Sequence, residues 1–92
     1  MHDGPLPHLV QYGRPGCHLC EDSRALVTAI LEERTRSGLA VPAVVERDIE
    51  SDPAWERAFL TTIPVLELGD HRLELALSSG KIRRFLADAL DG

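Results

Sequence analysis

The stretch Gly16-Cys17-His18-Leu19-Cys20 decides the fold, because it stands where an extended apolar segment gives way to a helical one. Both cysteines of the chain lie in this stretch, so one helical turn would carry both sulfur atoms. Backbone N–H groups in the first turn of a helix lack partners within the helix and carry positive partial charge. A cysteine placed there has its thiol pKa lowered from about 8.5 to between ~3.5 and 7.5, and the thiolate is the nucleophile. The pattern predicts dithiol redox chemistry.

The two cysteines are predicted to act in turn. Cys17 stands at the start of the helix, so its thiolate would attack a disulfide. Cys20 follows three residues later on the same face and would attack the mixed disulfide formed on Cys17, which releases the substrate thiol. His18 and Arg14 add positive charge nearby, and a protonated His18 would favour the Cys17 thiolate.

The composition sets broad limits on function. The 92 residues form one small domain, 1–92, and their 43% hydrophobic content is typical of a globular protein. A net charge of −5 argues against nucleic-acid binding. No apolar run approaches ~18 residues and the start has no charged segment before an apolar one, so we expect a cytoplasmic protein with no membrane partner. We also expect a monomer.

The order of apolar patterns predicts an α/β fold. The short start with Pro5 and Pro7 is expected to be irregular, and Gly69-Asp70 is a plausible hairpin turn. The second strand should be buried and parallel to the first, because a long helix separates the two. In the fourth strand, Leu73, Leu75 and Leu77 are expected to alternate with polar or small residues. The predicted strands cover residues 8–12, 41–45, 65–68 and 72–77, and the predicted helices cover 18–36, 54–60 and 78–90.

The resulting order is β-α-β-α-β-β-α. A parallel β-α-β half would join a β-β-α half around one four-stranded mixed sheet that is flanked by helices. This is the minimal thioredoxin-like arrangement.

Three motifs carry a family resemblance that extends from about His8 to Leu90. They are Tyr12-Gly13-Arg14-Pro15-Gly16-Cys17-His18-Leu19-Cys20-Glu21, Asp48-Ile49-Glu50-Ser51-Asp52-Pro53 and Ile63-Pro64-Val65-Leu66. Together, in this order, they resemble the glutaredoxin-like family of small bacterial thioredoxin-fold proteins. The resemblance implies a thiol-disulfide oxidoreductase that reduces protein or glutathione mixed disulfides. It also implies that Cys17 attacks, that Cys20 resolves, and that Pro64 is the family's cis-proline packed against the dithiol.

The resemblance further implies a set of substrate-binding residues. Arg14 matches the position of a lysine that holds the glycyl carboxylate of glutathione, and Thr62 and Ile63 match a segment whose backbone pairs with the substrate peptide. We add His18 beside Cys17, and Ser79, whose N–H groups at a helix start could bind a carboxylate. No cofactor is expected, and either glutathione or a thioredoxin-type reductase would be the reductant.

The sequence departs from the family pattern at two places. His18-Leu19 stands where glutaredoxins usually have Pro-Tyr, and Ser78-Ser79-Gly80-Lys81 replaces their Gly-Gly followed by Asp. The reduction potential and the reductant are therefore not carried over from the family.

Two alternatives to a redox enzyme stay open. Cys17, His18 and Cys20 could be metal ligands, although adjacent residues chelate poorly together and a closed zinc site needs four ligands. An iron-sulfur cluster shared between two chains, by analogy with some glutaredoxins, is the main form of this metal-binding module. The other alternative is an adaptor that binds partners at the sheet edge near Pro64 without turnover.

Overall fold

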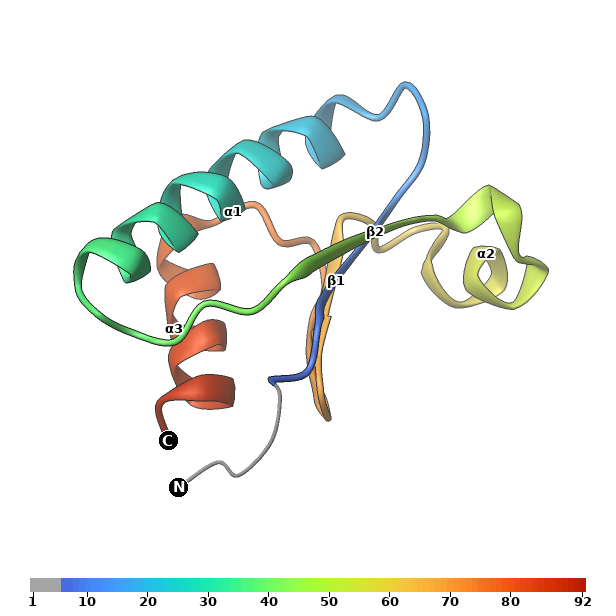
Figure 1. The fold of residues 1–92 in the computed structure, drawn as a ribbon. Coiled ribbons are helices and arrows are strands. Elements are labelled where there is room, and N and C mark those ends of the chain that lie inside the picture. Colours follow the sequence, from blue (N-terminus) through green and yellow to red (C-terminus); the bar gives the residue numbers. More distant parts are fainter. Residues whose placement is uncertain (1–5) are drawn as a thin grey trace.

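The computed structural model describes residues 6–92, which fold into four strands and three α-helices (Figure 1). The predicted order is confirmed, and a short 3-10 turn, η1 (Ile49–Ser51), is added after the second strand. The irregular start predicted at Pro5 falls outside the described residues. The elements are β1 (Leu9–Gly13), α1 (His18–Arg36), β2 (Val44–Asp48), α2 (Pro53–Phe59), β3 (Val65–Leu68), β4 (His71–Leu73) and α3 (Ser79–Leu90).

The four strands form one mixed sheet in the order β2-β1-β3-β4. β1 and β2 are parallel, with Leu9 opposite Val44 and Gly13 opposite Asp48. β3 runs antiparallel to both β1 and β4. In Figure 1, α1 and α3 cover one face of the sheet and α2 lies on the other. This is the thioredoxin-like fold, as predicted.

The apolar side chains form two clusters. The first, the helix-pair cluster, packs α1 and α3 against the sheet; the second, the end cluster, gathers where β1 ends and β3 begins. The helix-pair cluster consists of Leu9, Val27, Ile30, Leu66, Leu68, Ala76, Ile82, Phe85 and Leu86. The end cluster consists of Tyr12, Cys20, Ile49, Phe59, Ile63 and Val65.

The helix ends follow the signals in the sequence. Asp52 accepts a hydrogen bond from Ala54 N (2.9 Å) and Pro53 begins α2. Ser78 caps α3 through a bond from Lys81 N (3.3 Å). After α1, Gly38 adopts a φ of 71°, which glycine reaches without steric cost.

The second strand differs from the prediction in bounds and in burial. β2 runs from Val44 to Asp48 instead of over 41–45, and the bond from Leu9 N to Ala43 O (2.8 Å) lies directly before it. Pro42 has no N–H to donate, which disfavours an earlier start. The prediction that the strand is buried is wrong, because β2 is an edge strand and Val44 is 41% exposed.

The fourth strand is shorter than predicted. β4 ends at Leu73, and the chain then leaves the sheet to lie against the segment before β3, with Leu75 N bonded to Thr62 O and Ala76 N to Pro64 O. Leu75 has a φ of 49°, which breaks the alternation of a strand. As a result Ala76 is fully buried, whereas Leu75 and Leu77 are exposed.

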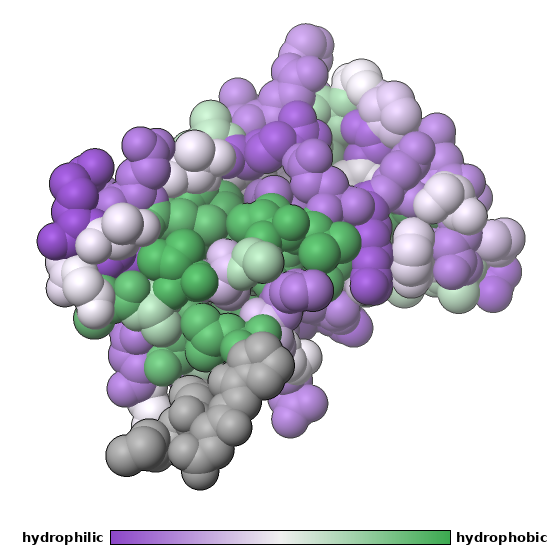
Figure 2. Space-filling model, in the orientation of Figure 1, coloured by the Kyte–Doolittle hydropathy of each residue, from purple (hydrophilic) through white to green (hydrophobic). Residues whose placement is uncertain are grey.

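On the face drawn in Figure 2, polar side chains surround one apolar area. Along the segment that leads from α1 into β2, the exposed large apolar residues are Leu39, Val41 and Val44. Within residues 6–92, none of the helices combines the length and the apolar character needed to cross a bilayer.

Candidate active site

Cys17 is the N-cap residue of α1. Its backbone is extended (φ −92°, ψ 104°), and its Sγ accepts a hydrogen bond from the backbone N–H of Cys20 at 3.1 Å. Gly16, with a φ of 74°, turns the chain just before it. Cys17 is a half-buried residue, and its Sγ lies against the first amides of the helix, which have no partner within the helix.

Cys20 lies one turn into α1 and points toward the sheet. It forms a disulfide with Cys17, with 5.2 Å between the two Cα atoms, and it is only 5% exposed. A Cβ atom added at Gly13 of β1 would stand 3.1 Å from Cys20 Sγ. Because Gly13 has no side chain, the Cys20 side chain has room to pack into the end cluster.

The segment before β3 packs against this dithiol. The Ile63–Pro64 peptide bond is cis, as the resemblance implied. Ile63 and Cys20 belong to the end cluster, and Cys17 packs against it. The structure thus brings together the dithiol and the cis-proline segment, which lie far apart in the sequence.

The backbone of that segment is partly engaged within the chain. The N–H groups of Thr62 and Ile63 both donate to the carbonyl of Phe59, at 2.9 and 3.1 Å, and Thr62 O accepts from Leu75 N. Strand addition by a substrate peptide would compete with these bonds. The substrate-binding role of Thr62 and Ile63 stays a prediction.

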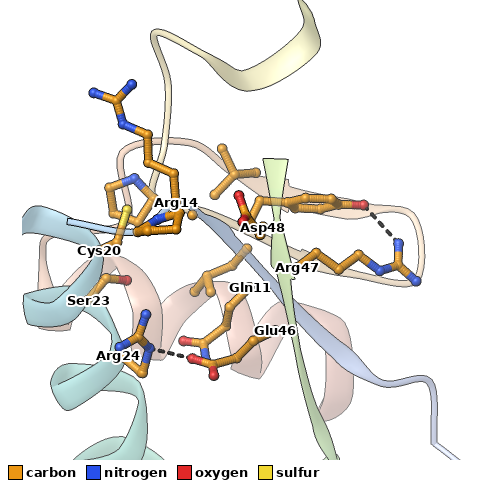
Figure 3. A pocket seen from close by; sticks show the side chains of 14 residues that line it. Gln11, Arg14, Cys20, Ser23, Arg24, Glu46, Arg47 and Asp48 are labelled. Carbon is orange, nitrogen blue, oxygen red and sulfur yellow. Dashed lines mark hydrogen bonds and ion pairs between the residues drawn. The ribbon is translucent and has the colours of Figure 1, made fainter. Parts of the chain in front are cut away.

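A cavity of about 320 Å³ opens directly beside the buried cysteine (Figure 3). Arg14 and Pro64 line it together with Cys20, so the structure groups three of the predicted site residues around one space. The full lining is Gln11, Tyr12, Gly13, Arg14, Pro15, Cys20, Ser23, Arg24, Glu46, Arg47, Asp48, Pro64, Val65 and Leu66.

His18 and Ser79 are not among the lining residues. The imidazole of His18 is 94% exposed, and its Nδ1 lies 3.6 Å from Glu21 Oε2. Ser79 is the first residue of α3, but Ser78 supplies the cap. The structure therefore leaves both of these predicted binding residues away from the cavity.

The sequence analysis missed several polar residues of the cavity, of which three matter most. Ser23 is 2% exposed, and its Oγ has no hydrogen-bond partner among the described residues. Arg24 forms an ion pair with Glu46 of β2. The position of Ser23 three residues after Cys20 was a signal that places both on one helix face. Nothing in the sequence indicated that Glu46 lines the cavity, because its position depends on the register of β2 against β1.

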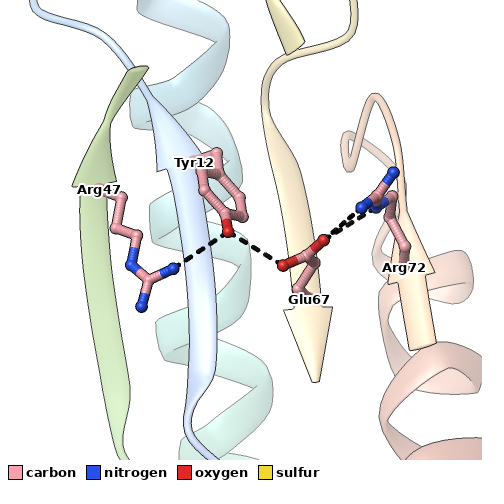
Figure 4. A network of polar contacts seen from close by, with 4 residues as sticks. All are labelled: Tyr12, Arg47, Glu67 and Arg72. Atoms are coloured by element: carbon pink, nitrogen blue, oxygen red, sulfur yellow. Dashed lines mark hydrogen bonds and ion pairs between the residues drawn. The ribbon is translucent and has the colours of Figure 1, made fainter. Parts of the chain in front are cut away.

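A second polar network lies on the sheet face that carries α2 (Figure 4). The hydroxyl of Tyr12 donates to Glu67 Oε1 (3.0 Å) and accepts from Arg47 (3.2 Å), while Glu67 also holds Arg72 (2.6 Å). Burial, followed by the bond to Glu67, raises the pKa of Tyr12 above its ordinary value. The network fixes Tyr12, whose ring packs on Phe59 in the end cluster beneath the dithiol.

The described residues form no group of side chains that could bind a metal ion. Among residues 6–92, no three His, Cys, Asp or Glu side chains gather in a way that could hold a metal ion. An iron-sulfur cluster shared between two chains stays a prediction.

Comparisons with known proteins agree with the fold. Protein XcR50 from X. campestris has a similar structure, with a TM-score of 0.65 and 26% sequence identity over 88% of this chain and 97% of that one. Protein Ne2328 from Nitrosomonas europaea, at a TM-score of 0.63 and 22% identity over 92% and 96% of the two chains, shares the fold. No curated protein matches the chain. The model of the glutaredoxin-like domain (DUF836) matches residues 8–87. The chain belongs to this glutaredoxin-like domain family.

Proposed function

We propose that the protein is a thiol-disulfide oxidoreductase that reduces protein or glutathione mixed disulfides. The observation that carries the proposal is the position of Cys17 Sγ at the start of α1. There it accepts a hydrogen bond from the backbone N–H of Cys20, and the two cysteines form a disulfide. In the reduced protein, the bond and the helix dipole stabilise negative charge on the Cys17 sulfur and so favour the thiolate, which is the nucleophile.

The reaction proceeds in two exchange steps. The Cys17 thiolate attacks one sulfur of the substrate disulfide, forms a mixed disulfide and expels the first substrate thiolate. Cys20, after losing its proton, attacks Cys17 Sγ and expels the second thiolate, which leaves the Cys17–Cys20 disulfide. The substrate gains two electrons and the protein loses two. Glutathione or a thioredoxin-type reductase then returns the protein to the dithiol, and the cytoplasm is the proposed compartment because both systems operate there.

Activity assays on cysteine variants test the proposal. Reduced wild-type protein should reduce insulin or a glutathione mixed disulfide, whereas Cys17→Ser should lose the reaction because the nucleophile is gone. Cys20→Ser should keep the first step and accumulate a mixed disulfide with the substrate, visible by intact mass. Equal turnover by the wild type and Cys17→Ser would refute the proposal.

The role of Arg14 in binding glutathione has a separate test. Arg14 is exposed at the mouth of the cavity, where its guanidinium could pair with a carboxylate. Arg14→Gln should raise the KM for a glutathione mixed disulfide several-fold and leave kcat nearly unchanged, because the contact is lost equally in the ground and transition states. Arg57→Gln, an exposed position on α2, is the matched control. A similar KM for both variants would exclude the contact.

A further inference from the structure

The outer edge of β2 carries backbone groups that no other strand binds within residues 6–92, because the sheet order is β2-β1-β3-β4. The bond from Leu9 N to Ala43 O shows that Ala43 faces β1, and the alternation along a parallel strand gives Val45 the same direction. The N–H and C=O groups of Val44 and Glu46 therefore point away from the sheet. A further strand could bind these groups.

Exposed apolar side chains lie along the same edge. Val44 is 41% exposed, and Leu39 and Val41, on the segment that leads into β2, are 46% and 38% exposed. Figures 1 and 2 share one orientation, in which β2 lies in front of β1 and the apolar area faces the reader. A free edge beside exposed apolar side chains is typical of a surface that binds another chain.

The residues along this edge restrict how a second copy of the chain could pair with it. Two copies related by a two-fold axis pair antiparallel, and residues that point outward lie opposite one another. An axis at Glu46, or at the residue after it, sets carboxylates opposite each other, Glu46 with Glu46 or with Asp48, which is unfavourable. An axis at Val44 sets Pro42 opposite Glu46, and the missing N–H of proline leaves the Glu46 C=O without a donor. These registers are therefore disfavoured.

An axis at Val45 avoids both conflicts. Val44 of one copy then lies opposite Glu46 of the other, and the two residues exchange a pair of N–H···O bonds. Val45 lies opposite itself, so two apolar side chains meet across the axis. Pro42 lies opposite Asp48, whose C=O already accepts a side-chain hydroxyl of its own chain at 2.6 Å and needs no further donor. The edge is therefore complementary to itself in this register.

We propose that two copies of the chain associate through β2 in this register, in place of the monomer expected from the sequence. A second copy brings the same free edge and the same apolar area, and no like charges lie opposite each other. The two four-stranded sheets join into one. Cys17 follows the end of β1, which is parallel to β2, so the antiparallel pair sets the two dithiols at opposite ends of the joined sheet. The association therefore does not depend on the proposed function.

Sedimentation velocity over a range of protein concentrations tests the association. The wild type should pass from monomer to dimer as the concentration rises. Val44→Glu sets a carboxylate opposite Glu46 at two symmetric places and should raise the dimer dissociation constant roughly tenfold or more. Val44→Lys sets a cation there and should keep the dimer. Leu77→Glu, at a similarly exposed apolar residue (38%) on the segment after β4, is the charge-matched control and should behave as wild type.

Disulfide trapping tests the register. Val45 and its copy would form a pair without hydrogen bonds between them, with Cα atoms about 4.5 Å apart, which lies within the range of disulfides. With Cys17 and Cys20 closed as a disulfide, mild oxidation of Val45→Cys should give a covalent dimer, visible by intact mass. Arg47→Cys lies on the same face of β2 but away from its copy, and should cross-link at least roughly tenfold more slowly.

Several results would overturn the inference. One is a wild type that stays monomeric at millimolar concentration. Another is a dimer that Val44→Glu and Leu77→Glu weaken equally, or that neither weakens, because the interface would then lie elsewhere. Slow hydrogen exchange of the Val44 and Glu46 N–H groups in a monomer would show that the chain covers its own edge, which also excludes the dimer. An intact dimer without disulfide reductase activity would instead contradict the proposed function alone.

Discussion

The space around Cys20 is set by a single missing side chain, that of Gly13. A Cβ atom there would lie 3.1 Å from Cys20 Sγ and 3.2 Å from its Cβ, which is too close without a shift of one element. Gly13→Ala should therefore lower the free energy of unfolding by about 1–3 kcal/mol, the usual cost of overpacking. Denaturant unfolding of the oxidised and reduced proteins measures this effect.

A second glycine provides the control for that substitution. A Cβ at Gly80 in α3 meets only Ser78 Oγ, at an ordinary 3.8 Å. Gly80→Ala should be neutral or stabilising by up to about 1 kcal/mol, because alanine favours the helix. If the two variants had the same stability, Gly13 would not be a packing requirement of the site.

At the residue scale, the sequence predicted the dithiol better than its surroundings. The spacing of Cys17 and Cys20 and the change from strand to helix both depend on residues close together in the chain. The sequence of that stretch is therefore enough to predict them. The relation of Cys20 to Ser23 was also local, but only burial shows that the hydroxyl of Ser23 lacks a partner. Glu46 reaches the cavity through strand pairing between distant segments, which no local pattern encodes.

At the element scale, the sequence predicts which segments form helices and strands. It does not predict how buried each strand is in the sheet. Helical periodicity gave α1 over His18–Arg36 as observed. The valine-rich run before Glu46 looks the same in a central strand and in an edge strand, and only the sheet order assigns β2 to the edge. The alternation through Leu75 and Leu77 failed because hydrogen bonds to Thr62 and Pro64 draw that segment out of the sheet.

A buried arginine ties two elements together and predicts a pH effect on stability. Arg34 of α1, with a side chain 7% exposed, donates to both oxygens of Asp91 at the end of α3, at 2.6 and 3.1 Å. The hydrogen bonds from Arg34 hold the pKa of Asp91 below its ordinary 3.8. Because the folded-state pKa is the lower one, this stabilisation is complete above the unfolded value near 3.8 and is lost as pH falls through the folded value.

Asp91→Asn tests this contact. The variant should be less stable than wild type by about 1–2 kcal/mol at pH 7, and the difference should shrink as the pH falls below 3.8, where the wild-type carboxylate also becomes protonated. Thermal unfolding across pH 2–7 measures the gap. Asp88→Asn, an exposed α3 position, serves as the control. A gap that is constant with pH would show that Asp91 acts through packing alone.

At the scale of the whole molecule, the dithiol is supported by one of the two apolar clusters. Cys20 is a member of the end cluster with Tyr12 and Phe59, whereas the helix-pair cluster lies between α1, α3 and the other part of the sheet. The reduction potential depends on the difference in stability between the oxidised and reduced folded proteins. Only packing that changes between these two forms can alter that difference, so the end cluster should influence the potential more than the helix-pair cluster does.

Two core truncations test this division. Phe59→Ala and Leu86→Ala each remove a buried side chain and should each cost about 2–5 kcal/mol of stability. Phe59→Ala should also change the stability gap between the oxidised and reduced forms, and with it the potential in a glutathione redox buffer, where about 30 mV corresponds to 1.4 kcal/mol. Leu86→Ala should lower the stability of both forms equally and leave the potential unchanged. Equal shifts of the potential in both variants would show that the two clusters act on the dithiol as one core.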